Sequence, residues 1–200
     1  MSSRSWYRIF IMDIKESFFI KYDEVKYLNE NEIELKRVLV RPRTSALISR
    51  LREFQFKLLH KILYFNDKLF QIGIKQTNLC SFCRVEEETA SHVFFYCQKV
   101  KTIWGDLGEQ LKIECLSELT WSEVLLGISG GTGKIQFINH IVLLVKYVIF
   151  NARNKGKSPT IQDICKLLLE NREQEKQIAE SRNSLSLHLR KWEHFSYSSN

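Results

Sequence analysis

The chain has 200 residues, of which 44% are hydrophobic and 26% charged, with only eight glycines and two prolines. This length suits one domain, or one domain with a small satellite, and the hydrophobic fraction excludes a disordered or collagen-like chain. So few glycines and prolines favour a mainly helical fold over a β-sandwich or barrel. The net charge of +7 is concentrated, since residues 36–75 hold ten basic and two acidic residues and the remainder sums to −1. Such a stretch favours a polyanionic partner.

Residues 1–43 are expected to form an N-terminal segment. They contain no apolar run followed by a small-residue cleavage site, so we expect no secretory signal and an intracellular location, cytoplasmic or nuclear, where thiols stay reduced. Residues 6–12 and 33–40 fit a short strand as well as a helix, and the sequence leaves both open.

A basic helix is predicted from residue 44 onward. Its apolar stripe recurs every three or four positions at Leu47, Leu51, Phe54, Leu58 and Ile62. Basic side chains lie about 60° from this stripe, where they can reach a phosphate backbone while their stems pack. We therefore predict nucleic-acid contacts by Arg41, Arg43, Arg50, Arg52, Lys57 and Lys61. An ordinary solvated helix face is the alternative. The nearby aromatic residues tilt the balance toward nucleic acid, although most of them are expected in the core: Phe56, Tyr64, Phe65 and Phe70.

The clearest chemical motif is Cys80-Ser-Phe-Cys83, followed after eight residues by His92 and after four more by Cys97. A two-residue gap lets two thiolates on a tight turn take adjacent positions of a tetrahedral zinc site, and the other two donors follow from a helix whose N-cap is Thr89. Four protein donors leave no open position, so the Zn²⁺ is expected to be structural and to fold a segment with few core residues. Three thiolates leave a charge of −1, which three nearby residues can balance: Arg84, Lys99 and Lys101. Residues 44–104 are thus predicted to combine a basic helix with a CCHC zinc-binding module.

Residues 105–200 are predicted to form a C-terminal helical region. Thr120 to Glu123 has the pattern of a capping box, and a glycine-rich loop at 130–133 precedes a long helix over 134–152. The apolar run 135–150 is about 24 Å long as a helix, shorter than the roughly 30 Å of a bilayer core. We therefore expect a buried helix and no membrane contact.

Two further helices are predicted after the long one. Ser158-Pro159-Thr160 with Asp163 starts the first, which turns Ile161, Ile164 and Leu168 inward. Residues 170–176 form a charged run that we expect to be solvated. Leu185, Leu189 and Trp192 are expected to form the apolar face of the last helix.

Nothing in the sequence has the pattern of an active site. Gly133-Lys134 lacks the other residues that a phosphate-binding loop requires, and no aspartates are paired to hold two magnesium ions. The cysteines outside the motif, Cys115 and Cys165, are expected to be inert buried thiols. The other histidines have no spacing to one another or to an acid that suggests catalysis or metal binding: His60, His140, His188 and His194. We expect no enzymatic activity and no small-molecule substrate.

Taken together, the segments Phe54–Leu63, Asn66–Leu69 and Cys80–Cys97, with Trp104, resemble the zinc-binding C-terminal region of reverse transcriptases from LINE-type, non-LTR retrotransposons. Residues 5–10 are similar to the end of a polymerase thumb connection, and 146–192 to the helical tail after the zinc module. The resemblance implies zinc on the four ligands, with Trp104 packing behind them, and a role in holding the element RNA. The chain departs from the family in lacking the polymerase's catalytic aspartates and any nuclease domain, so we expect it neither to copy nor to cut nucleic acid.

These observations predict a mainly α fold, an irregular helical domain with an embedded CCHC structural zinc module and with short extended segments left open within the first 40 residues. The predicted function is binding of RNA or single-stranded nucleic acid, without polymerase or nuclease activity. Two alternatives stay open: a scaffold that presents an apolar groove to a protein partner, and a translated retroelement remnant without a selected function.

Overall fold

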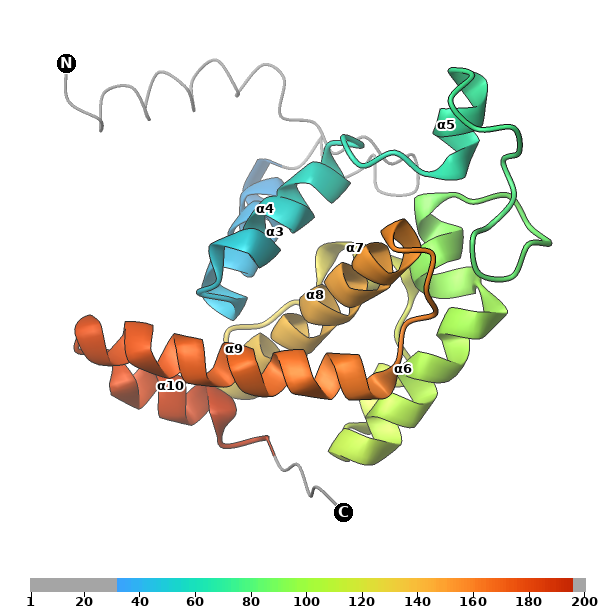
Figure 1. The fold of residues 1–200 in the computed structure, drawn as a ribbon. Helices are drawn as coiled ribbons and strands as arrows, with labels where there is room; N and C mark the ends of the chain where they lie inside the picture. The colour runs from blue at the N-terminus through green and yellow to red at the C-terminus, as the bar shows by residue number, and fades with distance from the viewer. Residues whose placement is uncertain (1–31, 196–200) are drawn as a thin grey trace.

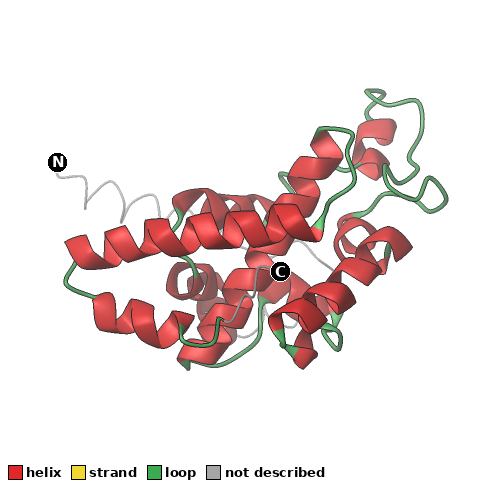
Figure 2. Cartoon of the chain, turned by 60° about the horizontal axis from the view of Figure 1, so that its bottom comes forward, coloured by secondary structure: helices red, strands yellow, loops and turns green. Residues whose placement is uncertain are grey.

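The computed structural model describes residues 32–195, and in this range every regular element is a helix (Figure 1, Figure 2). The elements are α3 (Glu32–Ser45), α4 (Ser49–Leu59), α5 (Asn66–Gln71), the π-helical turn η2 (His92–Tyr96), α6 (Gln98–Leu111), the 3₁₀ turn η3 (Glu114–Leu116), α7 (Trp121–Leu126), α8 (Gly133–Asn154), α9 (Ile161–Ser181) and α10 (Leu185–Trp192). The prediction of a mainly helical domain is confirmed. Residues 33–40 belong to α3, whereas residues 6–12 lie outside the described residues.

The core is built around α8, whose side chains from Phe137 to Lys146 are all buried. Helices α3, α4, α9 and α10 pack against it, and it lies in the middle of the molecule (Figure 1). By length and composition α8 is apolar enough to span a membrane, yet 67% of its most apolar window is buried inside the protein. A helix that is apolar nearly all round is typical of a core element. The predicted buried helix is therefore confirmed.

The starts of three helices follow from local capping chemistry. Thr120 Oγ1 accepts a hydrogen bond from the backbone N–H of Glu123, whose carboxylate accepts one from the Thr120 N–H, which completes the capping box of α7. The hydroxyls of Thr132 and Thr160 cap α8 and α9 in the same way, each accepting from the amide three positions later. The predicted starts of these helices are confirmed.

The helix predicted from residue 44 through Ile62 is wrong in its bounds, because residues 46–48 separate α3 from α4, and α4 ends at residue 59. The backbone N–H of Leu47 donates to Glu175 Oε1 at 2.7 Å rather than to a helical carbonyl, and this long-range bond explains the break. Ile62 lies beyond α4 and is 51% exposed. The middle of the predicted stripe is confirmed by the buried side chains of Leu51, Phe54 and Leu58. The predicted boundary after residue 43 falls inside α3.

Two predictions about the C-terminal helices are wrong. The charged run on α9, expected to be solvated, includes the buried Glu175. On α10 the leucines expected to face inward are exposed, Leu185 by 36% and Leu189 by 59%, while Lys191 and Trp192 are buried. Glu175 explains both differences, since it accepts hydrogen bonds from Lys191 Nζ and Trp192 Nε1 and so turns this face of α10 inward.

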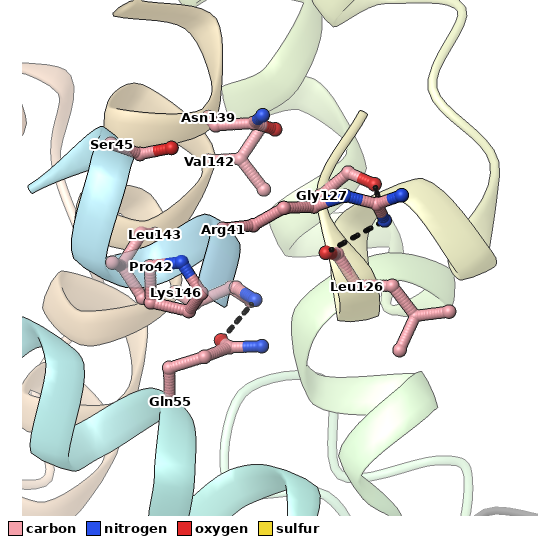
Figure 3. A pocket seen from close by; sticks show the side chains of 10 residues that line it. All are labelled: Arg41, Pro42, Ser45, Gln55, Leu126, Gly127, Asn139, Val142, Leu143 and Lys146. Carbon is pink, nitrogen blue, oxygen red and sulfur yellow. Dashed lines mark hydrogen bonds between the residues drawn. The ribbon is translucent and has the colours of Figure 1, made fainter. Parts of the chain in front are cut away.

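Lys146 is a buried lysine on α8. Its Nζ donates to Gln55 Oε1 at 2.7 Å and to the carbonyl of Leu125 at 3.3 Å. Figure 3 shows Lys146 and Gln55 pointing toward one another beside Arg41, where these side chains border a cavity of about 20 Å³. Burial lowers the pKa of Lys146 to about 7.

Comparison of the wild type with Lys146→Met is expected to show that the burial of Lys146 makes the free energy of unfolding depend on pH. The unfolded chain keeps Lys146 protonated up to its ordinary pKa of 10.5, whereas the folded chain releases the proton above about pH 7, so folding is favoured as pH rises. Between pH 7 and pH 9 the wild type should gain roughly 2 kcal/mol in free energy of unfolding relative to Lys146→Met. Urea unfolding measures this difference, and the exposed Lys166→Met on α9 serves as control. A difference that does not change with pH contradicts the lowered pKa.

Candidate metal centre

Cys80, Cys83, His92 and Cys97 lie together, and their ligand atoms all fall within 4.8 Å of one another. Cys80 Sγ is 3.9 Å from Cys97 Sγ, and Cys83 Sγ is 3.3 Å from His92 Nε2. In a tetrahedral site with Zn–S distances near 2.3 Å, neighbouring sulfurs are about 3.8 Å apart. Three thiols and one imidazole are also donors that zinc prefers in structural sites. The four residues therefore fit a bound zinc ion.

The first pair of ligands sits on a tight turn. The Cys80 N–H donates to the carbonyl of Glu86 at 2.8 Å, and the Arg84 N–H donates to the carbonyl of Cys80 at 2.9 Å. Arg84 has a φ of +59°, a left-handed conformation that reverses the chain directly after Cys83. An isolated antiparallel bridge between residues 79 and 87 closes the base of this turn.

The second pair is positioned by η2. Thr89 Oγ1 accepts from the His92 N–H at 3.1 Å, so Thr89 caps the turn that presents His92, as predicted. The Cys97 N–H donates to the carbonyl of His92 at 2.7 Å, five residues back. A π turn is wider than an α-helical turn, so residues five positions apart stay near one face. This is why His92 and Cys97 meet the same centre.

Trp104 on α6 supports the ligand-bearing turn from behind, as the resemblance implies. It is 4% exposed, and its Nε1 donates to the carbonyl of Phe94 at 2.9 Å. Phe94, two residues after His92, is fully buried and meets the rings of Phe54 and Phe65 edge-on, with centroids 6.1 and 5.6 Å away. The metal centre is thereby joined to the aromatic core between α4 and α6.

The thiols differ in how readily they ionise. Burial raises the pKa of Cys80 to about 12 and also raises that of Cys97. Burial raises the pKa of Cys83 too, but hydrogen bonds from two backbone amides and from His92 outweigh it and lower the pKa to about 6. Cys80 and Cys97 therefore need a nearby cation in order to lose their protons and act as thiolate ligands. Three residues predicted to balance the charge of −1 on a zinc ion with three thiolates are all exposed: Arg84, Lys99 and Lys101.

One buried residue at this centre has no signature in the sequence. Glu88 is fully buried, and its Oε2 accepts from the N–H of Ser81, which lies between the two cysteines of the turn, at 2.6 Å. Its Oε1 accepts from the N–H of Asn66 at 2.9 Å and from Arg153 Nε at 3.0 Å. No local pattern could have predicted this role, because the partner on α8 is 65 positions away.

Arg41, predicted to contact nucleic acid, is engaged within the protein. Its side chain is 13% exposed, and its guanidinium donates to the carbonyl of Gly127 at 3.1 Å and to Glu34 Oε1 at 2.8 Å. Figure 3 shows the guanidinium directed at the end of α7. Arg41 therefore joins α3 to the loop after α7, and its contact with nucleic acid stays a prediction.

The other residues predicted to contact nucleic acid differ in their surroundings. Arg50 Nη2 donates to Asn171 Oδ1 on α9 at 3.0 Å, and Lys57 pairs with Glu53 at 2.6 Å. Lys61 lies after the end of α4 in a turn, with a φ of +51°. Three of these cationic side chains are exposed: Arg43, Arg50 and Lys61. The other two are half-buried: Arg52 and Lys57.

The part of the chain that holds the metal centre is similar to a known protein family. Residues 29–104 match a protein family described as zinc-binding in reverse transcriptase, and the match contains all four candidate ligands and Trp104. No curated protein and no solved structure matches the chain significantly. Residues 29–104 are thus a zinc-binding module similar to that of reverse transcriptases, and the Cys₃His cluster within it offers the four donors.

Proposed function

We propose that the chain is a zinc-stabilised module that binds RNA or single-stranded nucleic acid, derives from a LINE-type reverse transcriptase and has no catalytic activity. The observation that carries this proposal is the segment of residues 61–75, in which exposed aromatic and basic side chains alternate. We call it the α5 segment. Its helix lies at the edge of the molecule (Figure 1).

The α5 segment exposes rings to which bases can stack. Tyr64 is 50% and Phe70 48% exposed, whereas Phe65 is buried in the core. Stacking of a base on an aromatic ring contributes about 1–3 kcal/mol and tolerates any sequence. Phosphate contacts require cations nearby. The same segment carries three exposed lysines: Lys61, Lys68 and Lys75.

The zinc module holds the base of the α5 segment. Asn66 Nδ2 donates to the carbonyl of Leu79 at 2.8 Å and to Ser81 Oγ at 3.3 Å. The Asp67 N–H donates to the carbonyl of Glu88 at 3.3 Å. Because these partners flank or lie within the ligand turn, the order of the α5 segment depends on that turn. This supports a role for zinc in organising the nucleic-acid surface.

The donor set favours a structural metal over a catalytic one. Four protein donors complete a tetrahedral site, whereas a catalytic zinc keeps one position for water or substrate. This supports the part of the proposal that assigns the chain no catalytic activity.

RNA binding is expected to become both weaker and less dependent on salt when three lysines are changed together to Ala: Lys61, Lys68 and Lys75. Each lost phosphate contact on a single strand lowers the slope of log K against log salt by about 0.7, so the slope should fall by about 2. Tyr64→Ala and Phe70→Ala should each weaken binding roughly 10-fold with the slope unchanged, because stacking is not ionic. Fluorescence anisotropy with a labelled single-stranded RNA at several salt concentrations measures both quantities.

A matched control changes three exposed lysines outside the α5 segment to Ala: Lys155, Lys166 and Lys176. It removes the same charge and should leave affinity and slope unchanged. If both triple variants behave alike, net charge rather than the α5 segment carries the binding, and this assignment is wrong. Absence of RNA binding at low salt contradicts the whole proposal. The alternatives would then be a scaffold for a protein partner and a retroelement remnant without a selected function.

A further inference from the structure

Glu88 and Arg153 form a buried ion pair between the zinc module and the end of α8. Arg153 Nη2 lies 2.6 Å from Glu88 Oε1, and the two side chains are 9% and 0% exposed. The guanidinium also donates to Asn66 Oδ1 at 3.1 Å and lies 5.5 Å from the centroid of the Phe65 ring. A buried carboxylate needs such a partner, because removing its charge from water is costly.

The second oxygen of Glu88 reaches the backbone between two metal ligands. Oε2 accepts from the Ser81 N–H at 2.6 Å, and the next amide, that of Phe82, lies 3.4 Å from Cys80 Sγ. Two thiols on a tight turn take adjacent positions around zinc, so the backbone between them sets where the two sulfurs lie. Groups that hold ligands in this way commonly change metal affinity when they are lost.

We propose that Arg153 is a positioning residue for the metal centre, which acts through Glu88 and sets how tightly the chain binds zinc. Without the guanidinium, Glu88 would be a buried carboxylate without a counter-charge and would turn toward water. That change releases the Ser81 N–H and loosens the ligand turn. The inference rests on zinc binding by residues 29–104 and is independent of nucleic-acid binding.

Arg153 lies outside the residues that match the zinc-binding family. The helices after residue 104 therefore contribute to metal affinity, although they supply no ligand from the described residues to the Cys₃His cluster. Coupling between two sites is reciprocal, so bound zinc must in turn stabilise the last turns of α8.

Arg153→Met tests the proposal, because methionine keeps part of the stem over Phe65 and removes the charge. Its zinc affinity, measured by competition with a chelator, should be about 10- to 100-fold weaker than that of the wild type. Cobalt-loaded Arg153→Met should show altered visible absorption, which reports the ligand geometry. Arg153→Lys keeps the positive charge but lacks the forked N–H donors of the guanidinium, so it should bind zinc more tightly than Arg153→Met and more weakly than the wild type. The control is Arg172→Met, which removes an exposed arginine that lies over the ring of Phe195, outside the residues that match the zinc-binding family.

Wild-type zinc affinity and cobalt absorption in Arg153→Met would overturn the proposal even if its Tm falls, because Arg153 would then stabilise only the fold. If Arg153→Met does not fold, hydrogen exchange of the wild type decides. Chelation should accelerate exchange of the amides at 147–154 more than that of 138–146 in the same helix. Equal exchange at 147–154 with and without zinc overturns the coupling.

Discussion

Removal of zinc is expected to unfold residues 72–97 and to lower the Tm of the whole chain. Before η2, few apolar contacts hold this segment, since Ile72, Ile74 and Val85 are 48%, 67% and 73% exposed. Structural zinc contributes of the order of 10 kcal/mol to the folded state of small zinc-binding peptides at neutral pH. That exceeds what the remaining contacts of such an exposed segment supply.

The loss of structure after zinc removal should spread from the zinc ligands into the hydrophobic core. Cys80 and Cys97 belong to the same buried hydrophobic cluster as Phe94, whose ring packs edge-on against those of Phe54 and Phe65. When η2 melts, Phe94 leaves this cluster and the packing of α4 loosens. A large cavity of this kind typically costs 3–5 kcal/mol.

Calorimetry and hydrogen exchange, with and without a chelator, measure this effect. Cys97→Ser should reproduce the chelated state in zinc-containing buffer, and metal analysis should find one zinc per wild-type chain. Cys115→Ser is the control, because Cys115 is half-buried and lies outside the cluster. An unchanged Tm and unchanged exchange at residues 80–97 after chelation would contradict a structural zinc.

Features set by neighbours along the chain were predictable from the sequence. The ligand spacing from Cys80 to Cys97 works because a tight turn and a helical turn place donors by local geometry. The caps at Thr120 and Thr160 follow from a hydroxyl residue and an acid three positions apart. The burial of α8 follows from an apolar run with almost no polar face.

Features that depend on distant pairs were not predictable. A charged residue on a helix has the same local pattern whether it meets water or a buried partner. Arg41 binds a carbonyl 86 positions away, and Lys191 lies 2.9 Å from His140, 51 positions away. The same reason explains why α10 turns Lys191 inward and exposes Leu189, against its hydrophobic pattern.

Glu175 is the centre of the largest of these distant groups. Its Oε1 accepts from the Leu47 N–H at 2.7 Å and lies 3.4 Å from His140 Nδ1. Its Oε2 accepts from Lys191 Nζ at 2.5 Å and from Trp192 Nε1 at 3.1 Å. One carboxylate thereby joins α9 to α8, to α10 and to the break between α3 and α4.

The protonation of this group follows from burial and charge. Burial lowers the pKa of Lys191 and of His140. Burial alone would raise the pKa of Glu175, but hydrogen bonding to His140 and Lys191 and electrostatic attraction to both outweigh it and hold the pKa well below its ordinary value. Glu175 is thus a buried carboxylate that depends on Lys191, and Lys191 depends on it.

Glu175→Gln is expected to lower the free energy of unfolding by about 3–5 kcal/mol at neutral pH, because it leaves Lys191 buried without its counter-charge. Since the pKa of Glu175 is depressed in the folded state, its contribution is present above its ordinary pKa of 4.5 and is lost as pH falls. The difference between wild type and Glu175→Gln should therefore shrink as the pH is lowered from about 5 to 3. Urea unfolding across this range measures both effects.

Two variants separate a buried ion pair from simple loss of surface charge. Glu173→Gln removes the same charge from an exposed position on α9 and should change the free energy of unfolding by less than about 0.5 kcal/mol. Glu175→Leu combined with Lys191→Met removes both charges, so it should be more stable than Glu175→Gln although the Leu47 N–H and Trp192 Nε1 lose their acceptor. If the double variant is as unstable as Glu175→Gln, the lost acceptor rather than the unpaired lysine dominates. If Glu175→Gln resembles Glu173→Gln, the carboxylate does not hold these helices together.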